Sequence, residues 1–324
     1  MRKLRCLLYL LPVFILCTYA EAKSVSSKTK PIHAGNVVYT SFLGPVKSVR
    51  GEVAVMEDKS GKLVEGPRQL FTLIQYDAMG NPTKMENYDL SNQSKTKLEF
   101  SYNASKKLTQ VQEWVCLDSK AEKPSYEPLH KYTYKYDKKG NQIEELTYLK
   151  DSLESKMIHT YNAKGKVTES AMYRPPEKLL GRVTYVYDSK GNCIESATDR
   201  TDFGLTKIKS TYDSSGELSS CSRYNKDGGL YMKETVSIEG KRKKTSSYDE
   251  DSKMRQITVR ENDKIISQIL SNSDGATVRT IDFTYKYDAK GNTIKSTRCD
   301  QEYDNGKLRK KRVRIAYWTI NYYK

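Results

Sequence analysis

The sequence predicts an all-β protein, built as a repetitive antiparallel meander of β-hairpins, and three observations support this prediction. The motif Tyr-x-Tyr-Asp-x-x-Gly-Asn-x-Ile occurs three times, beginning at Tyr134, Tyr185 and Tyr285. Tyrosines followed by Asp or Asn recur at positions 136, 161, 187 and 212, which are 25, 26 and 25 residues apart. Helical patterning is almost absent. Because a fixed-period repeat determines the architecture, we expect a curled or spiral sheet of a single layer.

Each copy of the motif has the features of a hairpin with a defined turn. The alternation of tyrosines with Thr, Lys or Val puts the rings on one face, since a strand has a period of two residues. The Asp then caps backbone N–H groups, two residues form a type I turn, and the Gly adopts a left-handed conformation that only glycine reaches without steric cost. A period near 25 residues accommodates two strands of roughly eight residues and two turns.

Weaker copies extend the repeat in both directions. Strands are expected from Val46 onward, with a first turn at Asp58–Gly61. Residues 116–129 contain two prolines and lengthen one spacing to 34 residues, so an irregular loop is predicted there. The turn keeps its Gly at residues 76–81, 161–165, 212–216 and 303–306, and has lost it at 102–106 and 248–252.

The apolar residue after the turn does not keep a constant spacing. It falls seven positions after the Tyr in one group of copies and six positions after it in the other. Because a shift of one residue changes the face of a strand, either one group has a compensating bulge or both faces carry apolar surface. The residues concerned are Ile143, Ile194 and Ile294 in the first group, and Leu108, Val167 and Leu218 in the second.

These motifs resemble the YD repeats of bacterial Rhs-type cell-surface proteins, whose signature is an aromatic pair, Tyr-Asp, two variable residues and Gly. The resemblance covers roughly Leu70 to Lys310. It implies hairpins wound into a single-layer spiral sheet, in proteins linked with carbohydrate binding or with enclosing a toxin domain. The chain has too few repeats to close a shell and lacks the Asp-Pro-x-Gly-Leu motif that ends the core of large members. The toxin-carrying role is therefore not transferred.

Three regions are expected along the chain. Residues 1–22 have a basic start, an apolar run from Cys6 to Cys17 and a small-x-small site at Ala20–Ala22, which together predict a secretory signal peptide. Residues 23–36 are expected to be a flexible lead-in, and residues 37–324 to be the repeat domain. The protein is thus predicted to be exported to the periplasm, the cell surface or the medium, with no membrane span after signal cleavage.

The tyrosine face is expected to be concave and buried. Burying half of a Tyr side chain contributes roughly 2–3 kcal/mol, so a single hairpin is too weak alone and neighbouring hairpins must stack. Aromatic rings also stack on sugars, which makes this face the main candidate ligand-binding surface; the alternative is a purely structural ladder of rings. The candidate residues are Tyr134, Tyr136, Tyr185, Tyr187, Tyr285 and Tyr287.

The chain is basic, with a formal net charge of +16, and removal of the predicted signal, with three basic residues and one acidic, leaves +14. In an exported protein, basic runs favour acidic glycans, lipid head groups or an anionic envelope polymer over nucleic acid. Alternatively, they protect strand edges from aggregation. The two runs are Lys241, Arg242, Lys243 and Lys244, and Arg309, Lys310, Lys311 and Arg312.

Signatures of catalysis and of cofactor binding are missing from the sequence. It has no Gly-x-Ser-x-Gly elbow, no His-Glu-x-x-His, no phosphate loop and no dinucleotide fingerprint. It also has no Cys-x-x-Cys pair for a metal. We therefore expect no catalytic residue, no metal and no cofactor. The cysteines of the mature chain permit either disulfides or free thiols, and they are Cys116, Cys193, Cys221 and Cys299.

Together these features predict an exported, non-catalytic binding or envelope-interaction protein. Its expected ligand is a polysaccharide or an acidic surface polymer. One alternative is a structural envelope scaffold that contacts protein partners through its edges and turns. A second alternative is a glycan-degrading enzyme.

Overall fold

The computed structural model describes residues 32–34, 37–39, 42–89, 93–117, 125–201 and 204–323. The predicted signal peptide at residues 1–22 lies outside the described residues, as do most of the lead-in and residues 118–124 of the predicted loop. No helical segment among the described residues has the length and hydrophobicity that a membrane crossing requires.

The described residues form 23 strands, as expected for an all-β protein. β1 (Ile32–Ala34), inside the predicted lead-in, pairs with β2 (Val37–Tyr39). The other strands are β3 (Val46–Lys59), β4 (Lys62–Glu65), β5 (Gln69–Tyr76), β6 (Pro82–Tyr88), β7 (Ser94–Tyr102), β8 (Leu108–Cys116), β9 (Tyr126–Tyr136), β10 (Gln142–Leu149), β11 (Ser152–Tyr161), β12 (Val167–Arg174), β13 (Lys178–Tyr187), β14 (Cys193–Arg200), β15 (Gly204–Tyr212), β16 (Leu218–Tyr224), β17 (Leu230–Glu239), β18 (Arg242–Asp249), β19 (Met254–Glu261), β20 (Lys264–Ser271), β21 (Thr277–Tyr287), β22 (Thr293–Asp304) and β23 (Lys307–Tyr322).

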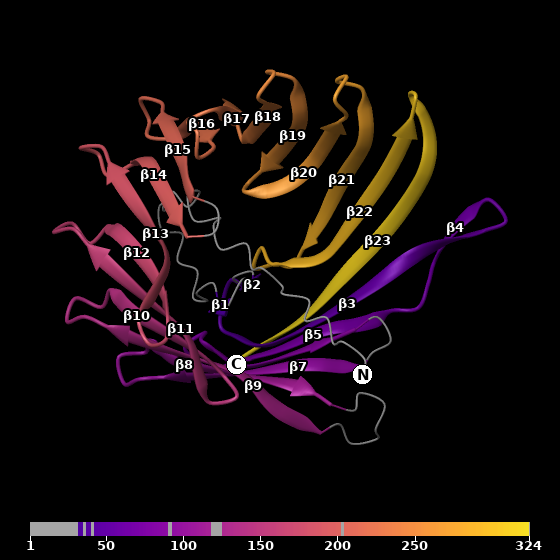
Figure 1. The fold of residues 1–324 in the computed structure, drawn as a ribbon. Coiled ribbons are helices and arrows are strands. Elements are labelled where there is room, and N and C mark those ends of the chain that lie inside the picture. Colours follow the sequence, from indigo (N-terminus) through magenta and orange to yellow (C-terminus); the bar gives the residue numbers. More distant parts are fainter. Residues whose placement is uncertain are drawn as a thin grey trace, which may run out of the picture.

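The antiparallel meander is confirmed, but the predicted open sheet is wrong, because the strands close into a barrel of 20 strands. The last strand, β23, pairs with β3 from Arg314–Val55 to Tyr322–Val46, so the two ends of the meander meet (Figure 1). Closure covers the part of each end strand that takes part in this pairing, which an open sheet would leave as an exposed edge. The predicted loop at 116–129 is also too long, since β9 already begins at Tyr126.

The turn predicted from the motif is confirmed in detail. In the copy at Asp188, the N–H of Gly191 donates to the Asp188 carbonyl at 3.0 Å, and Gly191 has a φ of 88°. The Asp188 carboxylate accepts hydrogen bonds from the backbone N–H and the side-chain amide of Asn192, at 2.8 and 2.9 Å. Asp77 and Asp137 hold their turns in the same way.

Two further turns of this type were missed in the sequence: the first follows Tyr224 in the same Tyr-Asn-x-x-Gly pattern as residues 161–165, and the second follows Ser271 and so lacks the Tyr. They are formed by Asn225–Gly229 and Asn272–Ala276, where the Asn side chain accepts the same two backbone hydrogen bonds. The copy at Tyr303–Gly306 departs from the prediction. There β22 continues to Asp304, and a two-residue turn joins it to β23.

A bulge after every turn of the main series explains the variable spacing of the apolar residues. In the copy at Tyr187, Cys193 lies opposite the Tyr and Ile194 is left out of the pairing. In the copy at Tyr161, Val167 lies opposite the Tyr and the next residue is left out. Both groups therefore share one bulge, and only the residue type at the bulge differs. The isoleucines occupy it and are partly exposed, Ile194 by 37%.

Tyrosine hydroxyls join neighbouring hairpins beside these bulges. Tyr187 Oη donates to the carbonyl of Val167 at 2.8 Å, and Tyr212 Oη donates to the carbonyl of Cys193 at 2.8 Å. Each acceptor precedes the bulge of the adjacent strand, where the ladder is interrupted and a carbonyl needs another donor. The equivalent hydrogen bond, from a Tyr hydroxyl to a backbone carbonyl, links Tyr102 to Pro82, Tyr136 to Leu108 and Tyr161 to Gln142.

Replacing Tyr187 by Phe is expected to lower the free energy of unfolding by about 1 kcal/mol, because the Val167 carbonyl loses its donor. Urea denaturation measures this difference. Tyr287→Phe is the matched control, since Tyr287 is 48% exposed at the same position of its own repeat. The control is expected to change the free energy by less than about 0.5 kcal/mol. Equal losses in both variants would contradict this role of the hydroxyl.

The turn aspartates predict a loss of stability in acid. Hydrogen bonds from Asn141 and Asn192, together with nearby backbone N–H groups, hold the pKa values of Asp137 and Asp188 below the usual 3.8. Because these pKa values are lower in the folded chain, the carboxylates stabilise the fold above the usual pKa, and the contribution is lost as the pH falls through the lowered values. The melting temperature should therefore drop as the pH falls below the usual aspartate pKa of 3.8.

The control for this acid effect is the double variant Asp137→Asn and Asp188→Asn. An amide oxygen keeps the two backbone hydrogen bonds, as Asn225 does in its own turn, but it does not titrate. The melting temperature of the double variant should fall less steeply in acid. An unchanged slope would show that other groups cause the acid loss.

The tyrosine face forms the inside of the barrel. Phe42, which precedes β3, packs edge-on against Tyr76 at a centroid distance of 6.5 Å, and Figure 1 shows β1 and β2 within the outline of the ring. The same face carries Met85, Val111 and Tyr134, which belong to one core cluster spanning β3, β5–β9 and β23. Residues that lie opposite each other on neighbouring strands point to the same face, so this face can be traced from strand to strand around the barrel. We call it the inner face.

Candidate functional site

The six predicted ligand-binding tyrosines share the inner face but differ in their surroundings. Tyr134 is 8% exposed and belongs to the core, where burial raises its pKa far above the usual value. Tyr136 and Tyr187 use their hydroxyls to join hairpins, and Tyr185 is half-buried. These four rings therefore have clear structural roles or limited access. Tyr285 is also half-buried, whereas Tyr287 is the most exposed of the six, at 48%.

The inner face of β21 carries a row of three rings, Phe283, Tyr285 and Tyr287. Phe283 and Tyr285 stack with centroids 6.5 Å apart and planes at 8°, and Tyr287 continues the row at 6.4 Å and 31°. The Tyr285 hydroxyl donates to the carbonyl of Ile265 at 2.7 Å, which fixes the middle ring. Tyr287 at the end of the row is 48% exposed. We call these three residues the β21 row.

Cations lie over both ends of the β21 row. The Arg298 guanidinium lies 5.8 Å from the centre of the Phe283 ring. Lys264 Nζ lies 4.3 Å from the Tyr287 centre and 5.2 Å from the Tyr285 centre, and partial burial lowers the pKa of Lys264. The positive charges face the negative ring faces, which stabilises both groups. The row thus combines flat apolar surface with positive charge.

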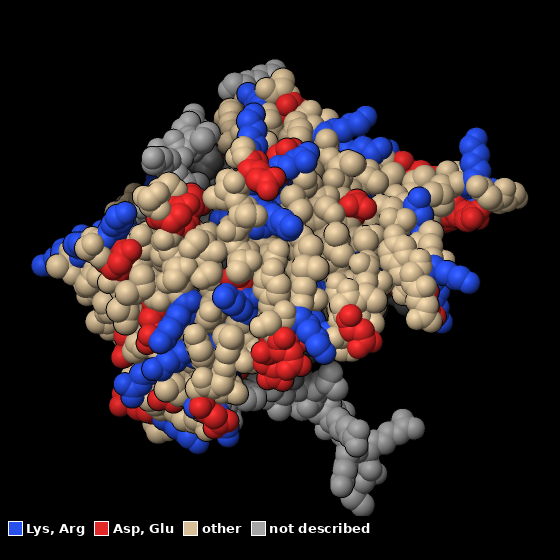
Figure 2. Space-filling model, turned by 90° about the horizontal axis from the view of Figure 1, so that it is seen from above, with Lys and Arg blue, Asp and Glu red and all other residues tan. Residues whose placement is uncertain are grey.

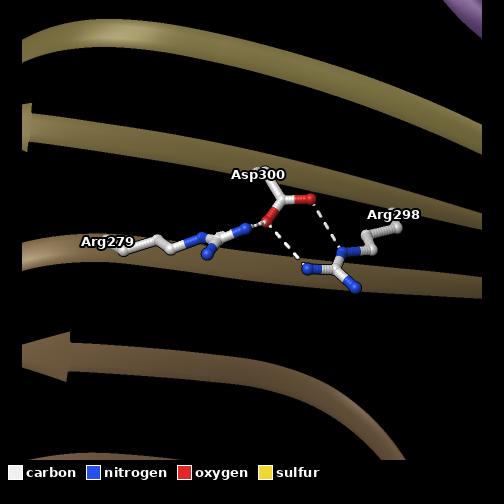
Figure 3. Close-up of polar contacts among 3 residues, drawn as sticks. All are labelled: Arg279, Arg298 and Asp300. Atoms are coloured by element: carbon white, nitrogen blue, oxygen red, sulfur yellow. Dashed lines mark hydrogen bonds and ion pairs between the residues drawn. The ribbon is translucent and has the colours of Figure 1, made fainter. Parts of the chain in front are cut away.

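A compact ion cluster continues the site next to Phe283, on the same face of β21 and β22 (Figure 3). Asp300 is 6% exposed and binds two guanidinium groups. Arg298 donates through Nε to Oδ2 at 2.7 Å and through Nη2 to Oδ1 at 3.0 Å, while Arg279 donates through Nη2 and Nε to Oδ1 at 2.5 and 3.1 Å. The Arg298 and Arg279 hydrogen bonds hold the pKa of Asp300 below its usual value. One carboxylate against two guanidinium groups leaves the cluster with one surplus positive charge.

A cavity of about 410 Å³, lined by both polar and apolar side chains, adjoins the cluster on the inner face of β17–β20. Its wall residue Leu270 pairs across the strands with Arg279, and Gln268 pairs with Ile281. Thr258 Oγ1 accepts hydrogen bonds from Gln256 at 2.8 Å and from Gln268 at 3.4 Å. Amide, hydroxyl and charged groups therefore line a space beside the aromatic row, an arrangement suited to hydroxyl-rich or anionic groups.

The two predicted basic runs lie in different settings. Lys241 and Arg242 are at the β17–β18 turn, and Arg242 pairs with Glu261 at 3.3 Å. The run 309–312 lies along β23, and all four of its residues are exposed. Figure 2 shows basic and acidic side chains interspersed on one side of the molecule, not gathered into a single positive field. Binding by either run remains a prediction.

Other titratable groups on the inner face have local partners. His130 Nδ1 lies 2.9 Å from Glu113 Oε2, and this contact raises the pKa of His130. Burial lowers the pKa of His159 and raises that of Glu145. Within the described ranges no three His, Cys, Asp or Glu side chains gather as a metal site would require. Among the described residues no disulfide joins the cysteines, which are Cys116, Cys193, Cys221 and Cys299.

Sequence reasoning missed Phe283, Arg279, Arg298 and Asp300. Phe283 was detectable, because it continues the alternation of Tyr285 and Tyr287 by one more step. The Arg279–Asp300–Arg298 cluster was not, because it depends on which residues of β21 and β22 face each other.

A family model for the Teneurin YD-shell matches residues 18–227, about two thirds of the chain. The chain belongs to this Teneurin YD-shell family. The match confirms the resemblance to YD repeats that the motifs carry. Beyond residue 227, the bulged hairpins of the YD-shell region continue in the structure to the last Tyr-Asp turn at Asp288.

Solved structures similar to this YD-shell protein are distant in sequence. A porin-like protein from Bacteroides uniformis is 11% identical, with 86% of this chain and 97% of that chain covered and a TM-score of 0.39. The TcdB2–TccC3 structure is 12% identical, with 79% of this chain and 15% of that chain covered and a TM-score of 0.35. A Bacteroides fragilis protein of unknown function is 11% identical, covering 58% and 100%, with a TM-score of 0.16. A search of curated proteins finds no match.

Proposed function

We propose that this YD-shell protein is an exported, non-catalytic envelope protein that binds an acidic polysaccharide on its inner face. The β21 row carries the proposal. Its three rings lie in one line on a single strand, a repeated platform for successive sugar rings, with Tyr287 accessible at one end. Arg298 and Lys264 supply positive charge beside the rings, and guanidinium groups pair well with carboxylate and sulfate groups.

The neighbouring cavity supports the same ligand class. It places amide and hydroxyl groups of Gln256, Thr258 and Gln268 next to the ion cluster, within one continuous face. Sugar hydroxyls both donate and accept hydrogen bonds, as these side chains do. The cavity therefore suits the polar edge of a sugar whose flat face lies on the row.

Affinity electrophoresis against polygalacturonate, a uronate polymer, and against neutral amylose tests the proposal. Tyr287→Ala is expected to weaken polygalacturonate binding about 5- to 10-fold, as loss of a stacking and cation–π platform implies. Tyr317→Ala is the matched control, because Tyr317 also has cations over its ring but lies on the outer face of β23, opposite Lys295 and Glu52. Equal weakening in the two variants, or no saturable binding to an acidic polymer, would contradict a site on the inner face.

A structural envelope scaffold is the second candidate. The five hydroxyl ties between hairpins favour it, because they give the tyrosines of β7–β15 a purely structural use. A scaffold would bind neither polymer in the experiment above. A glycan-degrading enzyme would instead release shorter products from the bound polymer.

A further inference from the structure

The outer half of β23 has a strand partner on only one side among the described residues. β23 pairs with β22 from Lys307 to Tyr317, but its pairing with β3 begins only at Arg314. Beyond that point β3 pairs with β4 instead, as a separate hairpin. Figure 1 shows the β3–β4 hairpin and the β22–β23 hairpin diverging. Residues 307–313, which we call the open edge, therefore present backbone groups that no described strand takes up.

The open edge is also strongly basic. Residues 300–314 contain six basic side chains and three acidic ones. Along the edge, Lys310 and Arg312 are on the inner face and Lys311 is on the outer face, since neighbouring residues of a strand alternate. Arg309 lies at a bulge, where the pairing with β22 skips one residue. Lys310 and Arg312 lie opposite Glu302 and Asp300 of β22, whereas Lys311 lies opposite the neutral Gln301. The surplus positive charge thus lies on both faces of the strand.

We propose that the open edge of β23 receives an extended acidic segment of another protein as an additional strand. Backbone hydrogen bonds to the edge would provide the attachment, as they do wherever a peptide adds to a sheet. Acidic residues at alternate positions of the added strand share one face, and on the outer face they would meet Lys311, which lies opposite a neutral residue of β22. Such cross-strand pairs are favourable, while like charges repel. The same repulsion disfavours a second copy of this chain, because its own open edge is equally basic.

Fluorescence anisotropy with a labelled seven-residue peptide, Glu-Val-Glu-Thr-Glu-Val-Glu, tests this proposal on the full chain. A second peptide of the same sequence with alternate backbone nitrogens methylated keeps the charge but removes donors for strand pairing. The unmodified peptide is expected to bind at least about tenfold more tightly than the methylated one. Equal binding of the two peptides would show attraction by charge alone and would overturn the proposal.

Two charge variants locate the site. Arg309→Glu with Lys311→Glu is expected to weaken peptide binding about tenfold or more, because two favourable cross-strand pairs become unfavourable. Lys241→Glu with Lys244→Glu makes the same change of charge in the β17–β18 hairpin. Since β18 is paired on both sides, this variant should leave binding within about twofold. Equal weakening by both variants, or self-association through residues 307–313 in sedimentation, would overturn the proposal. Circular dichroism verifies that each variant folds, and the methylated peptide tests the unaltered protein in any case.

Discussion

Met85→Ala is expected to lower the free energy of unfolding by about 2–5 kcal/mol, the range for truncating a large core side chain. Met85 lies on β6, is fully buried at 0% exposure, and belongs to the cluster that includes Ile74, Leu98 and Val111. These side chains come from four neighbouring strands, so a cavity here loosens several hairpins together. Urea denaturation followed by circular dichroism measures the loss.

Met79→Ala is the control for the core prediction. Met79 lies only six residues before Met85, in the turn between β5 and β6, and is 54% exposed. Its truncation removes the same atoms from the surface and should change the free energy of unfolding by less than about 0.5 kcal/mol. If the Met85 variant lost no more stability than the Met79 variant, the inner face of β5–β9 would not be the core of the fold.

Asn292→Ala is expected to lower the free energy of unfolding by about 2–4 kcal/mol, since it leaves two half-buried backbone groups of Leu43 without these partners. Asn292 is 4% exposed. Its Oδ1 accepts from the N–H of Leu43 at 2.6 Å, and its Nδ2 donates to the Leu43 carbonyl at 2.8 Å and to Tyr322 Oη at 2.7 Å. One side chain therefore joins the last Tyr-Asp turn to the segment before β3 and to the end of β23.

Tyr322 makes this arrangement possible. In the turns at Asp77, Asp137 and Asp188, the Asn amide donates to the carboxylate of the preceding Asp, whereas at Asp288 the Tyr322 hydroxyl takes that place. Partial burial alone would raise the pKa of Asp288, but the hydrogen bonds from Tyr322, Asn292 and Lys290 hold it below the usual value. The same contact raises the pKa of Tyr322 to about 12, after the larger effect of burial.

Asn192→Ala is the control for the Asn292 prediction. Asn192 occupies the same position of an equivalent turn, but its amide donates only to Asp188 within that turn. Its loss is expected to cost about 1 kcal/mol. Equal losses at positions 192 and 292 would mean that the contact with Leu43 adds nothing to the stability of the closed barrel.

The turns could be predicted from the sequence because their chemistry is local. Gly191 and its equivalents have positive φ, and the neighbouring Asp makes hydrogen bonds within four residues. Where the Gly has been lost, Lys106 and Ser252 adopt the same conformation, with φ of 59° and 61°. The surrounding hairpin thus imposes the turn even where its best residue is missing, which explains why the copies at 102–106 and 248–252 were assigned correctly.

Closure and the ion cluster could not be predicted because both depend on residues far apart in the sequence. The strand pair that closes the barrel joins Val46–Val55 to Arg314–Tyr322, and neither segment carries the repeat motif. Asp300 lies opposite Ile281, and the cluster forms because Arg279 is two residues from Ile281 on the same face of β21. The turn at Asp288 and the bulge after it set which residues of β21 and β22 lie opposite each other. The motif predicts the turn but not the bulge, so it does not give this register.

The pairing of β3 with β23 is the central claim, since the inner face and its site exist only if the strands close. Ser48 and Asn321 lie opposite each other, with Asn321 Nδ2 at 3.0 Å from Ser48 Oγ, a separation that suits a disulfide between paired strands. Mild oxidation of the Ser48→Cys, Asn321→Cys variant, followed by peptide mass mapping, should link positions 48 and 321 within one chain. Ser48→Cys with Ser237→Cys on β17 should give no such link. Unlinked cysteines at 48 and 321, or links only between two chains, would contradict the closed barrel.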